Sequence, residues 1–183
     1  MGKAVVIALL LSAALAGLGL WYTATRAYYA PVDGPVTLTL WPSEDPGDTP
    51  AAIPASDVSA IASGSSPLGF RACFTHELDL NRLGTDLPTA SRDRAQPTIA
   101  PGWFDCFDAE AIGTALERGE ARAFLAWPNA AYGVDRVVAL TADGRGWAWH
   151  ELNDCGRKAY DGTPVGRACP DRATFTPLTE GRF

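Results

Sequence analysis

Two His-Glu pairs, His76-Glu77 and His150-Glu151, contain both histidines of the chain. The zinc protease motif H-E-x-x-H needs a second histidine, and neither pair has one. If the two pairs met in space, they would offer a mixed His/Glu metal site or a proton-transfer pair. Neighbouring residues on a strand point to opposite faces, so only one member of each pair would reach such a site. Surface and hydrogen-bonding roles are the simpler interpretation, and we predict no catalytic residue, no metal site and no cofactor.

Four cysteines form the second candidate constellation: Cys73, Cys106, Cys155 and Cys169. An even number of cysteines in an exported domain indicates disulfides, and neither a C-x-x-C pair nor a zinc-ligand spacing occurs. Four cysteines allow three pairings. We favour Cys73–Cys106 and Cys155–Cys169, because the second pair closes a loop rich in Gly, Pro and Asp that has little apolar material of its own. A reactive Cys106 thiol is the alternative, since it precedes a predicted helix whose N-terminus lowers a thiol pKa.

Two tryptophans share one face of a predicted strand over residues 147–152. Side chains alternate along a strand, so Trp147 and Trp149 point to one face while His150 points to the other. Paired indoles form a stacking platform for a sugar ring, a peptide or a partner protein, and Trp147, Trp149 and His150 are the candidate ligand-binding residues. The alternative is that the indoles are core side chains packed on a helix over residues 108–118.

The elements that position these residues follow from local patterns. Alternating or apolar runs predict strands at 36–41, 68–74, 121–127, 134–141 and 147–152, and Asp143-Gly144 predicts a hairpin between the last two. Asp108 is a good N-cap and Gly119 a good C′ residue for the helix over 108–118. The expected fold is α+β, with a mostly antiparallel sheet of about five strands and one main helix.

The composition of the long stretches between these elements is typical of loops. Residues 42–67 are rich in Pro, Ser, Gly and Asp and are expected to be mostly loop, with a helical turn after Ser56. Residues 84–102 form another loop, in which the charges at 92–94 are expected to be solvated surface. One domain is expected over residues 31–169, followed by a flexible tail over 170–183.

The first 30 residues predict a membrane anchor with an interfacial segment. The uncharged run over residues 4–22 spans about 28 Å as a helix, close to the hydrocarbon thickness of a bilayer. Lys3 before the run and the acidic bulk after it favour a cytoplasmic N-terminus, and aromatic residues follow at the expected interface. A signal peptide cleaved after Ala14 or Ala16 is the alternative, and it would release the domain into the periplasm.

The net charge of the domain limits the classes of partner that it can bind. Lys3 and Arg26 precede residue 31, and all 21 acidic residues follow it, so the remaining 13 basic residues leave the domain at −8. A domain this acidic repels phosphate backbones, which excludes nucleic acid as a natural partner.

Three blocks of the sequence are distinctive: "FRACF", "PGWFDCFDAEAIG" and "DRVVALTADGRGWAWHELNDCG". With these blocks the chain resembles an uncharacterised family of short, single-span bacterial membrane-anchored proteins. The resemblance runs from the apolar segment to about Cys169. It implies a domain of unknown function and brings no catalytic residues.

These observations favour an anchored extracytoplasmic module in the cytoplasmic membrane that binds another envelope protein, as an accessory or assembly factor. A small-molecule or glycan-binding domain that uses the Trp147/Trp149 face is the alternative, and a hydrolase that uses His76 or His150 is a weaker one.

Overall fold

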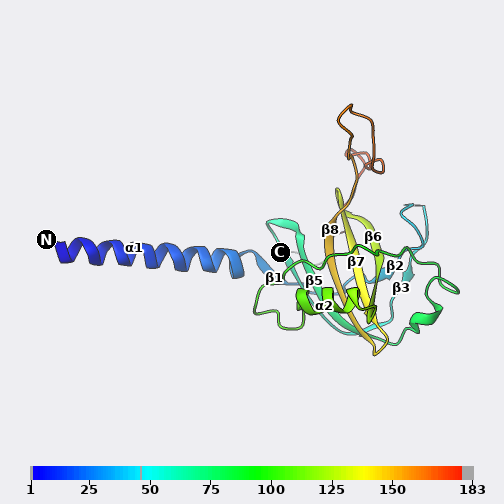
Figure 1. Ribbon diagram of the computed structural model, residues 1–183, viewed down its shortest axis with the longest axis horizontal. Coiled ribbons are helices and arrows are strands. Elements are labelled where there is room, and N and C mark those ends of the chain that lie inside the picture. The colour runs from blue at the N-terminus through cyan, green and yellow to red at the C-terminus, as the bar shows by residue number, and fades with distance from the viewer. Residues whose placement is uncertain (1, 46, 179–183) are drawn as a thin grey trace.

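The computed structural model describes residues 2–45 and 47–178. A long helix, α1 (Gly2–Tyr22), projects away from a single domain and continues into a π-helical turn, η1 (Thr23–Ala27) (Figure 1). All described side chains of α1 are exposed. The stretch from Gly2 to Ala27 is long and apolar enough to cross a membrane, as expected, although a signal sequence has the same properties. Because the helix is apolar on all sides, it has no polar face to turn toward water, as in a membrane span or a signal sequence.

A six-stranded antiparallel sheet forms the centre of the domain. Its order is β1-β4-β5-β8-β7-β6, so that β1 is the edge nearest α1 and β6 is the opposite edge (Figure 1). The strands are β1 (Tyr29–Pro31), β4 (Ala55–Ser63), β5 (Ser66–His76), β6 (Ala121–Ala131), β7 (Val134–Thr141) and β8 (Arg145–Leu152). A separate two-stranded sheet contains β2 (Thr39–Leu40) and β3 (Ala51–Ala52).

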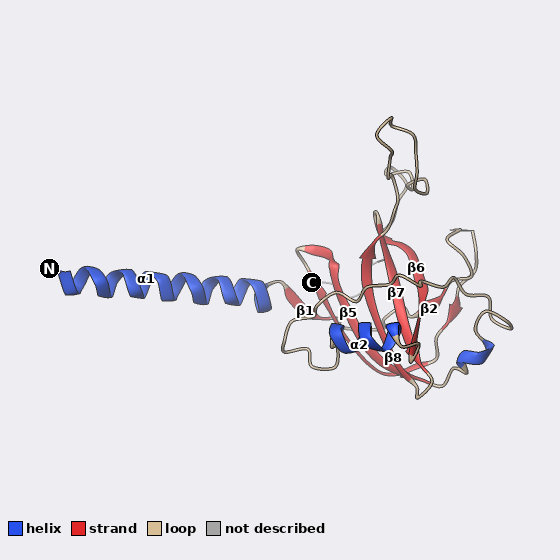
Figure 2. Ribbon diagram, in the orientation of Figure 1, coloured by secondary structure: helices blue, strands red, loops and turns tan. Residues whose placement is uncertain are grey.

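Both faces of the sheet are covered, which makes three layers. One face packs against Leu40 of β2, Ile53 directly after β3, and Leu80 of the short 3-10 helix η2 (Leu80–Arg82). The other face packs against α2 (Ala109–Glu117) and the loop before it (Figure 2). Strand β7 is buried along its whole length between these layers, which explains its nearly continuous apolar sequence.

Local sequence signals predicted α2 and the β7–β8 hairpin correctly. Asp108 caps the helix by accepting from the backbone N–H groups of Glu110 and Ala111, and Gly119 ends it with a φ of +70°. The left-handed φ is open to glycine at little cost. The strand expected over 134–141 has the observed bounds of β7.

The main sheet has six strands where about five were expected, and the mostly antiparallel α+β fold is as predicted. Two structural expectations need correction. The segment 42–67, expected to be mostly loop with a helical turn after Ser56, contains β3, β4 and the start of β5. The strand expected over 36–41 is limited to Thr39–Leu40 and lies outside the main sheet. Strand β4 has weak strand formers such as Ser59, but it pairs with β1 and β5, and this backbone pairing outweighs local propensity.

Both favoured disulfides are present. Cys73 on β5 is bonded to Cys106 before α2, and Cys155 is bonded to Cys169 across the loop that follows β8. The described cysteines include no free thiol, so the reactive Cys106 is not supported. Of the expected tail, the segment up to residue 178 returns to the β6–β7 turn, where the Phe175 ring packs on Tyr132 and the Leu178 N–H donates to the Ala130 carbonyl. Residues 179–183 lie outside the described residues.

Candidate functional site

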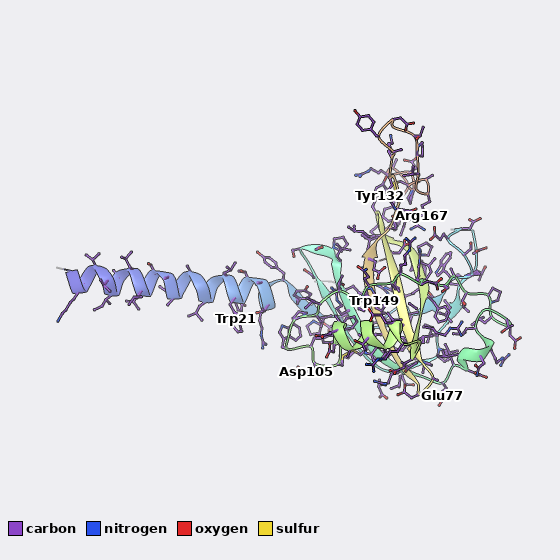
Figure 3. The ribbon with its side chains drawn as sticks, viewed as in Figure 1. Trp21, Glu77, Asp105, Tyr132, Trp149 and Arg167 are labelled. Carbon is purple, nitrogen blue, oxygen red and sulfur yellow. A yellow bond between two sulfur atoms is a disulfide. The ribbon has the colours of Figure 1, made fainter. Side chains whose placement is uncertain are left out.

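The two tryptophans of β8 are core residues. Trp149, labelled in Figure 3, is fully buried, and Trp147 is 9% exposed. Both belong to the hydrophobic cluster that joins the sheet to α2. The Trp149 indole N–H donates to Glu151 at 2.7 Å, and the Trp147 indole N–H donates to the Cys106 carbonyl at 3.2 Å. Burial leaves no ring face of Trp149 open for stacking. The indoles are therefore arranged as core side chains, which was the alternative to a stacking platform.

His150 points to the other face of the sheet and is also buried. Its Nε2 accepts from the Arg136 guanidinium at 3.1 Å, and its Nδ1 lies 2.5 Å from the Pro67 carbonyl. Because Nε2 accepts, Nδ1 must donate, which fixes a neutral imidazole with its proton on Nδ1. Burial and the nearby Arg136 charge lower the pKa of His150 to about 3. The ring stacks on Phe70 and has a structural role here, with no nitrogen left for a ligand.

The two histidines do not meet. His150 lies level with Phe70 in the β5–β8 register, and His76 lies six residues further along β5. Six residues of strand span about 20 Å. Burial also lowers the pKa of His76, whose Nδ1 accepts from the Leu78 N–H. The two His-Glu pairs therefore make no joint site, and among residues 2–45 and 47–178 no group of three or more His, Cys, Asp or Glu side chains is placed to hold a metal.

A charged cluster at the start of β7 is the strongest polar feature of the domain. Asp135, 3% exposed, forms ion pairs with Arg92 at 2.7 Å and with Arg167. Both arginines also pair with Glu44, at 2.7 Å from Arg92 and 3.4 Å from Arg167. Glu44, Arg92, Asp135 and Arg167 thus form a closed ring of alternating charge, which we call the charged ring. It joins three loops to the central sheet.

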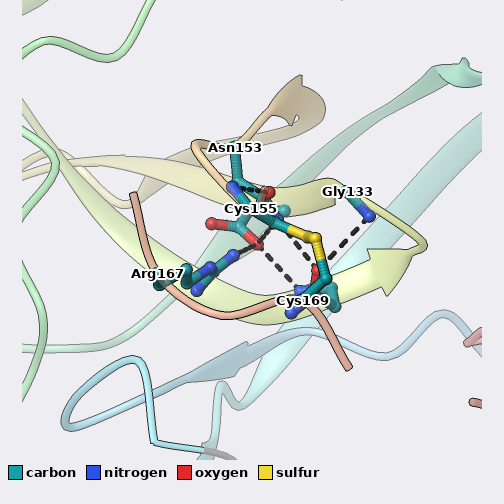
Figure 4. Close-up of a disulfide and its surroundings, with 7 residues drawn as sticks. Gly133, Asn153, Cys155, Arg167 and Cys169 are labelled. Carbon is teal, nitrogen blue, oxygen red and sulfur yellow. Dashed lines mark hydrogen bonds and ion pairs between the residues drawn. A yellow bond between two sulfur atoms is a disulfide. The ribbon is translucent and has the colours of Figure 1, made fainter. Parts of the chain in front are cut away.

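Two asparagines provide further hydrogen bonds to Asp135. Its Oδ1 accepts from the Asn129 backbone N–H and from the Asn153 side-chain amide, both at 2.8 Å. Asn129 has a φ of +51°, a left-handed conformation that asparagine tolerates, and its side-chain oxygen accepts from Gly133 and Asn153. Asn153 Oδ1 accepts from the Cys155 N–H, which links the ring to the disulfide loop (Figure 4).

The charged ring borders a cleft of about 330 Å³. Glu151, Asp154, Arg94 and Arg157 add further charges to its lining. Burial raises the pKa of Glu151, whose Oε1 accepts from the Trp149 indole and from the Gln96 N–H. A carboxyl with a raised pKa in a cleft is typical of functional sites. The cleft offers charges of both signs to a ligand, whereas the oxygens of Asp135 are already occupied by donors from within the protein.

Sequence reasoning missed this cluster. Arg92 was expected to be solvated, yet its side chain is 25% exposed and holds two carboxylates. The available signal was Asp135-Arg136, two adjacent charges at the start of an otherwise apolar strand. Such charges inside a buried strand must be paired, although their partners lie too far away in the sequence to be identified.

Fold and site together define a class: a disulfide-bonded α+β domain on an apolar N-terminal helix, with a charged cleft at the ends of its central strands. More particularly, the chain belongs to a family of unknown function, DUF6446, whose sequence pattern matches residues 39–170. This confirms the expected membership of an uncharacterised domain family. No match was found among curated proteins or among solved structures.

Proposed function

We infer that this protein is a single-pass membrane protein, with its N-terminus in the cytoplasm and its domain in the periplasm, that binds another protein of the cell envelope as an accessory or assembly factor. One observation supports the anchoring: α1 is apolar on all sides after Lys3, is exposed along its length, and is joined to the domain through η1 and β1. A bilayer would cover this surface. Two disulfides agree with an oxidising location for the domain.

Retention of the helix is favoured over cleavage. A cut after Ala16 would leave Leu18, Leu20 and Trp21 at the new N-terminus, and all three are more than half exposed. Such an apolar stub attached to a released domain would promote aggregation. The same side chains are well suited to the edge of a bilayer, where Trp and Tyr are enriched.

The charged cleft supports a binding role. Its lining carries Arg94 and Arg157, both exposed, beside Glu151 and Asp154. Complementary charges of both signs steer a partner and fix its register more than they add affinity. A charged peptide segment of a partner protein fits this lining. A small charged molecule is the second candidate, and it fits better than a glycan because the described lining of the cleft has no aromatic side chain for stacking.

Topology is tested by reporters fused after residue 183 in living cells. We expect activity from a reporter that works only outside the cytoplasm, together with an intact N-terminus and resistance of the protein to carbonate extraction from membranes. A reporter active only in the cytoplasm would contradict the proposed side of the membrane. A mature N-terminus near residue 15 or 17 would contradict the anchor.

The binding role is tested by a photo-crosslinking residue at position 157 in the cleft. The matched control is position 160 in the same disulfide loop, where Tyr160 is fully exposed and outside the cleft lining. We expect a discrete protein adduct from position 157 in intact cells and none from position 160. If neither position gives an adduct, the protein-partner role is wrong.

A further inference from the structure

A second cavity, of about 410 Å³, lies in the corner between the N-terminal helix and the domain. Leu20 and Thr23 line it from the helical segment, and Ser65, Ser66 and Arg71 line it from the β4–β5 hairpin and β5. The helical wall offers the apolar side chain of Leu20 and a Thr23 hydroxyl that already donates to the helix backbone, whereas the other wall carries serine hydroxyls and a cation.

The length of α1 places this corner at the surface of the bilayer. From Lys3, a hydrocarbon core of about 30 Å takes about 20 residues of helix and ends near Thr23. The domain is held at this depth, because β1 starts at Tyr29 and pairs with β4. The Trp103 indole also donates to the Thr25 carbonyl at 2.6 Å. The cavity thus lies where lipid headgroups meet acyl chains.

Arg71 brings an uncompensated positive charge to the cavity. It is 3% exposed, and its guanidinium donates to four backbone carbonyls, two on its own strand and two in the loop at Thr98 and Ile99. These bonds occupy four of its five N–H groups. Among residues 2–45 and 47–178, no carboxylate forms an ion pair with it, and burial lowers its pKa to about 10. The Phe107 ring, whose centroid lies 5.7 Å from the guanidinium carbon, adds a cation–π contact but no negative charge. A buried cation that is held by carbonyl dipoles and a ring face, with no carboxylate partner, is stabilised when an anion approaches.

We propose that this corner binds the phosphate group of a phospholipid from the leaflet at which α1 emerges. The serine hydroxyls and the Arg71 guanidinium face the phosphate, and Leu20 lies beside the first carbons of the acyl chains. Tyr28, which is 53% exposed and also lines the cavity, matches this boundary because its ring is apolar and its hydroxyl is polar. The proposal rests on the proposed function, since it requires α1 to be in a membrane.

The test is a lipid titration of the full-length protein in detergent micelles, followed by native mass spectrometry. The variant Arg71→Gln is a poor first choice, because it removes donors to four carbonyls. Ser65→Asp instead places a negative charge in the cavity from an exposed hairpin position. Ser59→Asp makes the same change at an exposed position of β4 that does not line the cavity.

We expect one saturable phosphatidylglycerol adduct per chain, weakened about tenfold by Ser65→Asp and unchanged by Ser59→Asp. Diacylglycerol with the same chains should give no adduct. Equal binding of diacylglycerol, or an equal effect of the two variants, overturns the proposal. Inorganic phosphate that binds as tightly as the lipid also overturns the proposal, since the site would then recognise a free anion rather than a lipid. The titration needs no cell, so the membrane topology of the protein is tested separately from it.

Discussion

Replacing Asp135 with Asn tests whether the charged ring holds the end of the sheet together. The substitution keeps the shape of the side chain and removes its charge, so that Arg92 and Arg167 share the single remaining carboxylate of Glu44. Breaking a buried ion pair costs about 3–5 kcal/mol, and we take the lower end because both arginines keep some exposure. A loss of about 3 kcal/mol lowers the midpoint of thermal unfolding by about 10 °C in a domain of this size.

The assay is thermal unfolding of the full chain in detergent, followed by near-ultraviolet circular dichroism of the buried tryptophans. Asp143→Asn is the matched control, because Asp143 pairs with Arg145 at the surface, where both side chains are more than half exposed. A surface pair of this kind contributes about 0.5 kcal/mol. If Asp135→Asn loses less than 1 kcal/mol, or no more than the control, the charged ring has no structural role and our reasoning is refuted.

Three further predictions concern other parts of the domain. Replacing both Cys155 and Cys169 with Ser should cost about 3 kcal/mol by the loop-entropy relation, since they lie 14 positions apart in the sequence, and an unchanged urea midpoint would contradict this. The His150 imidazole, with a folded-state pKa of about 3 and an unfolded value near 6.5, binds a proton only on unfolding between these values. Stability should therefore fall with decreasing pH by up to about 1.4 kcal/mol per unit in this window. His150→Gln, which can still accept from the arginine and donate to the carbonyl, should remove that slope in pH-dependent unfolding, and an unchanged slope would assign it to other groups. Gly146→Ala should destabilise the domain by about 1–3 kcal/mol, because the new Cβ would lie 2.2 Å from an aromatic ring of β5. Gly113→Ala in α2, where the new Cβ meets open space, should instead stabilise the domain by up to about 1 kcal/mol. Equal unfolding midpoints for the two variants would refute this contrast.

The parts of the fold that were predictable depend on short-range signals. The N-cap at Asp108, the terminating Gly119 and the Asp143-Gly144 turn each act within a few residues, so they can be read directly from the sequence. Strand β7 was equally clear, because burial on both faces demands an apolar run. The preference for Cys155–Cys169 likewise followed from a loop with little apolar material of its own.

Strand β4 was not predictable in this way. Its residues include Ser56, Asp57 and Ser59, which favour turns, and only Ala60 and Ile61 are buried. The strand exists because β1 and β5 offer it hydrogen bonds on both edges. Its pairing with β1 also attaches the domain close to α1. The decisive information was thus in the neighbours of the segment, which local pattern does not contain.

The charged ring was missed for a related reason. Its members Glu44, Arg92, Asp135 and Arg167 are spread over most of the domain and meet only when four separate segments are in place. Sequence patterns mark Asp135 as unusual but do not identify its partners. Sequence reasoning instead selected the tryptophans of β8, whose large aromatic rings serve a core equally well.

The adjacent charges of β7 also explain why this strand has a defined register. Asp135 faces the side of the sheet that carries the cleft, and Arg136 faces the other side, where its guanidinium lies 3.8 Å above the Phe70 ring and donates to His150 and to the Thr37 carbonyl. A shift of β7 by one residue would exchange the two faces, because side chains alternate along a strand. It would place a carboxylate against Phe70 and a guanidinium against the donors that now serve Asp135. The two buried charges therefore strongly disfavour the shifted register. The apolar residues of β7 disfavour it only weakly, because they are similar on both faces of the strand.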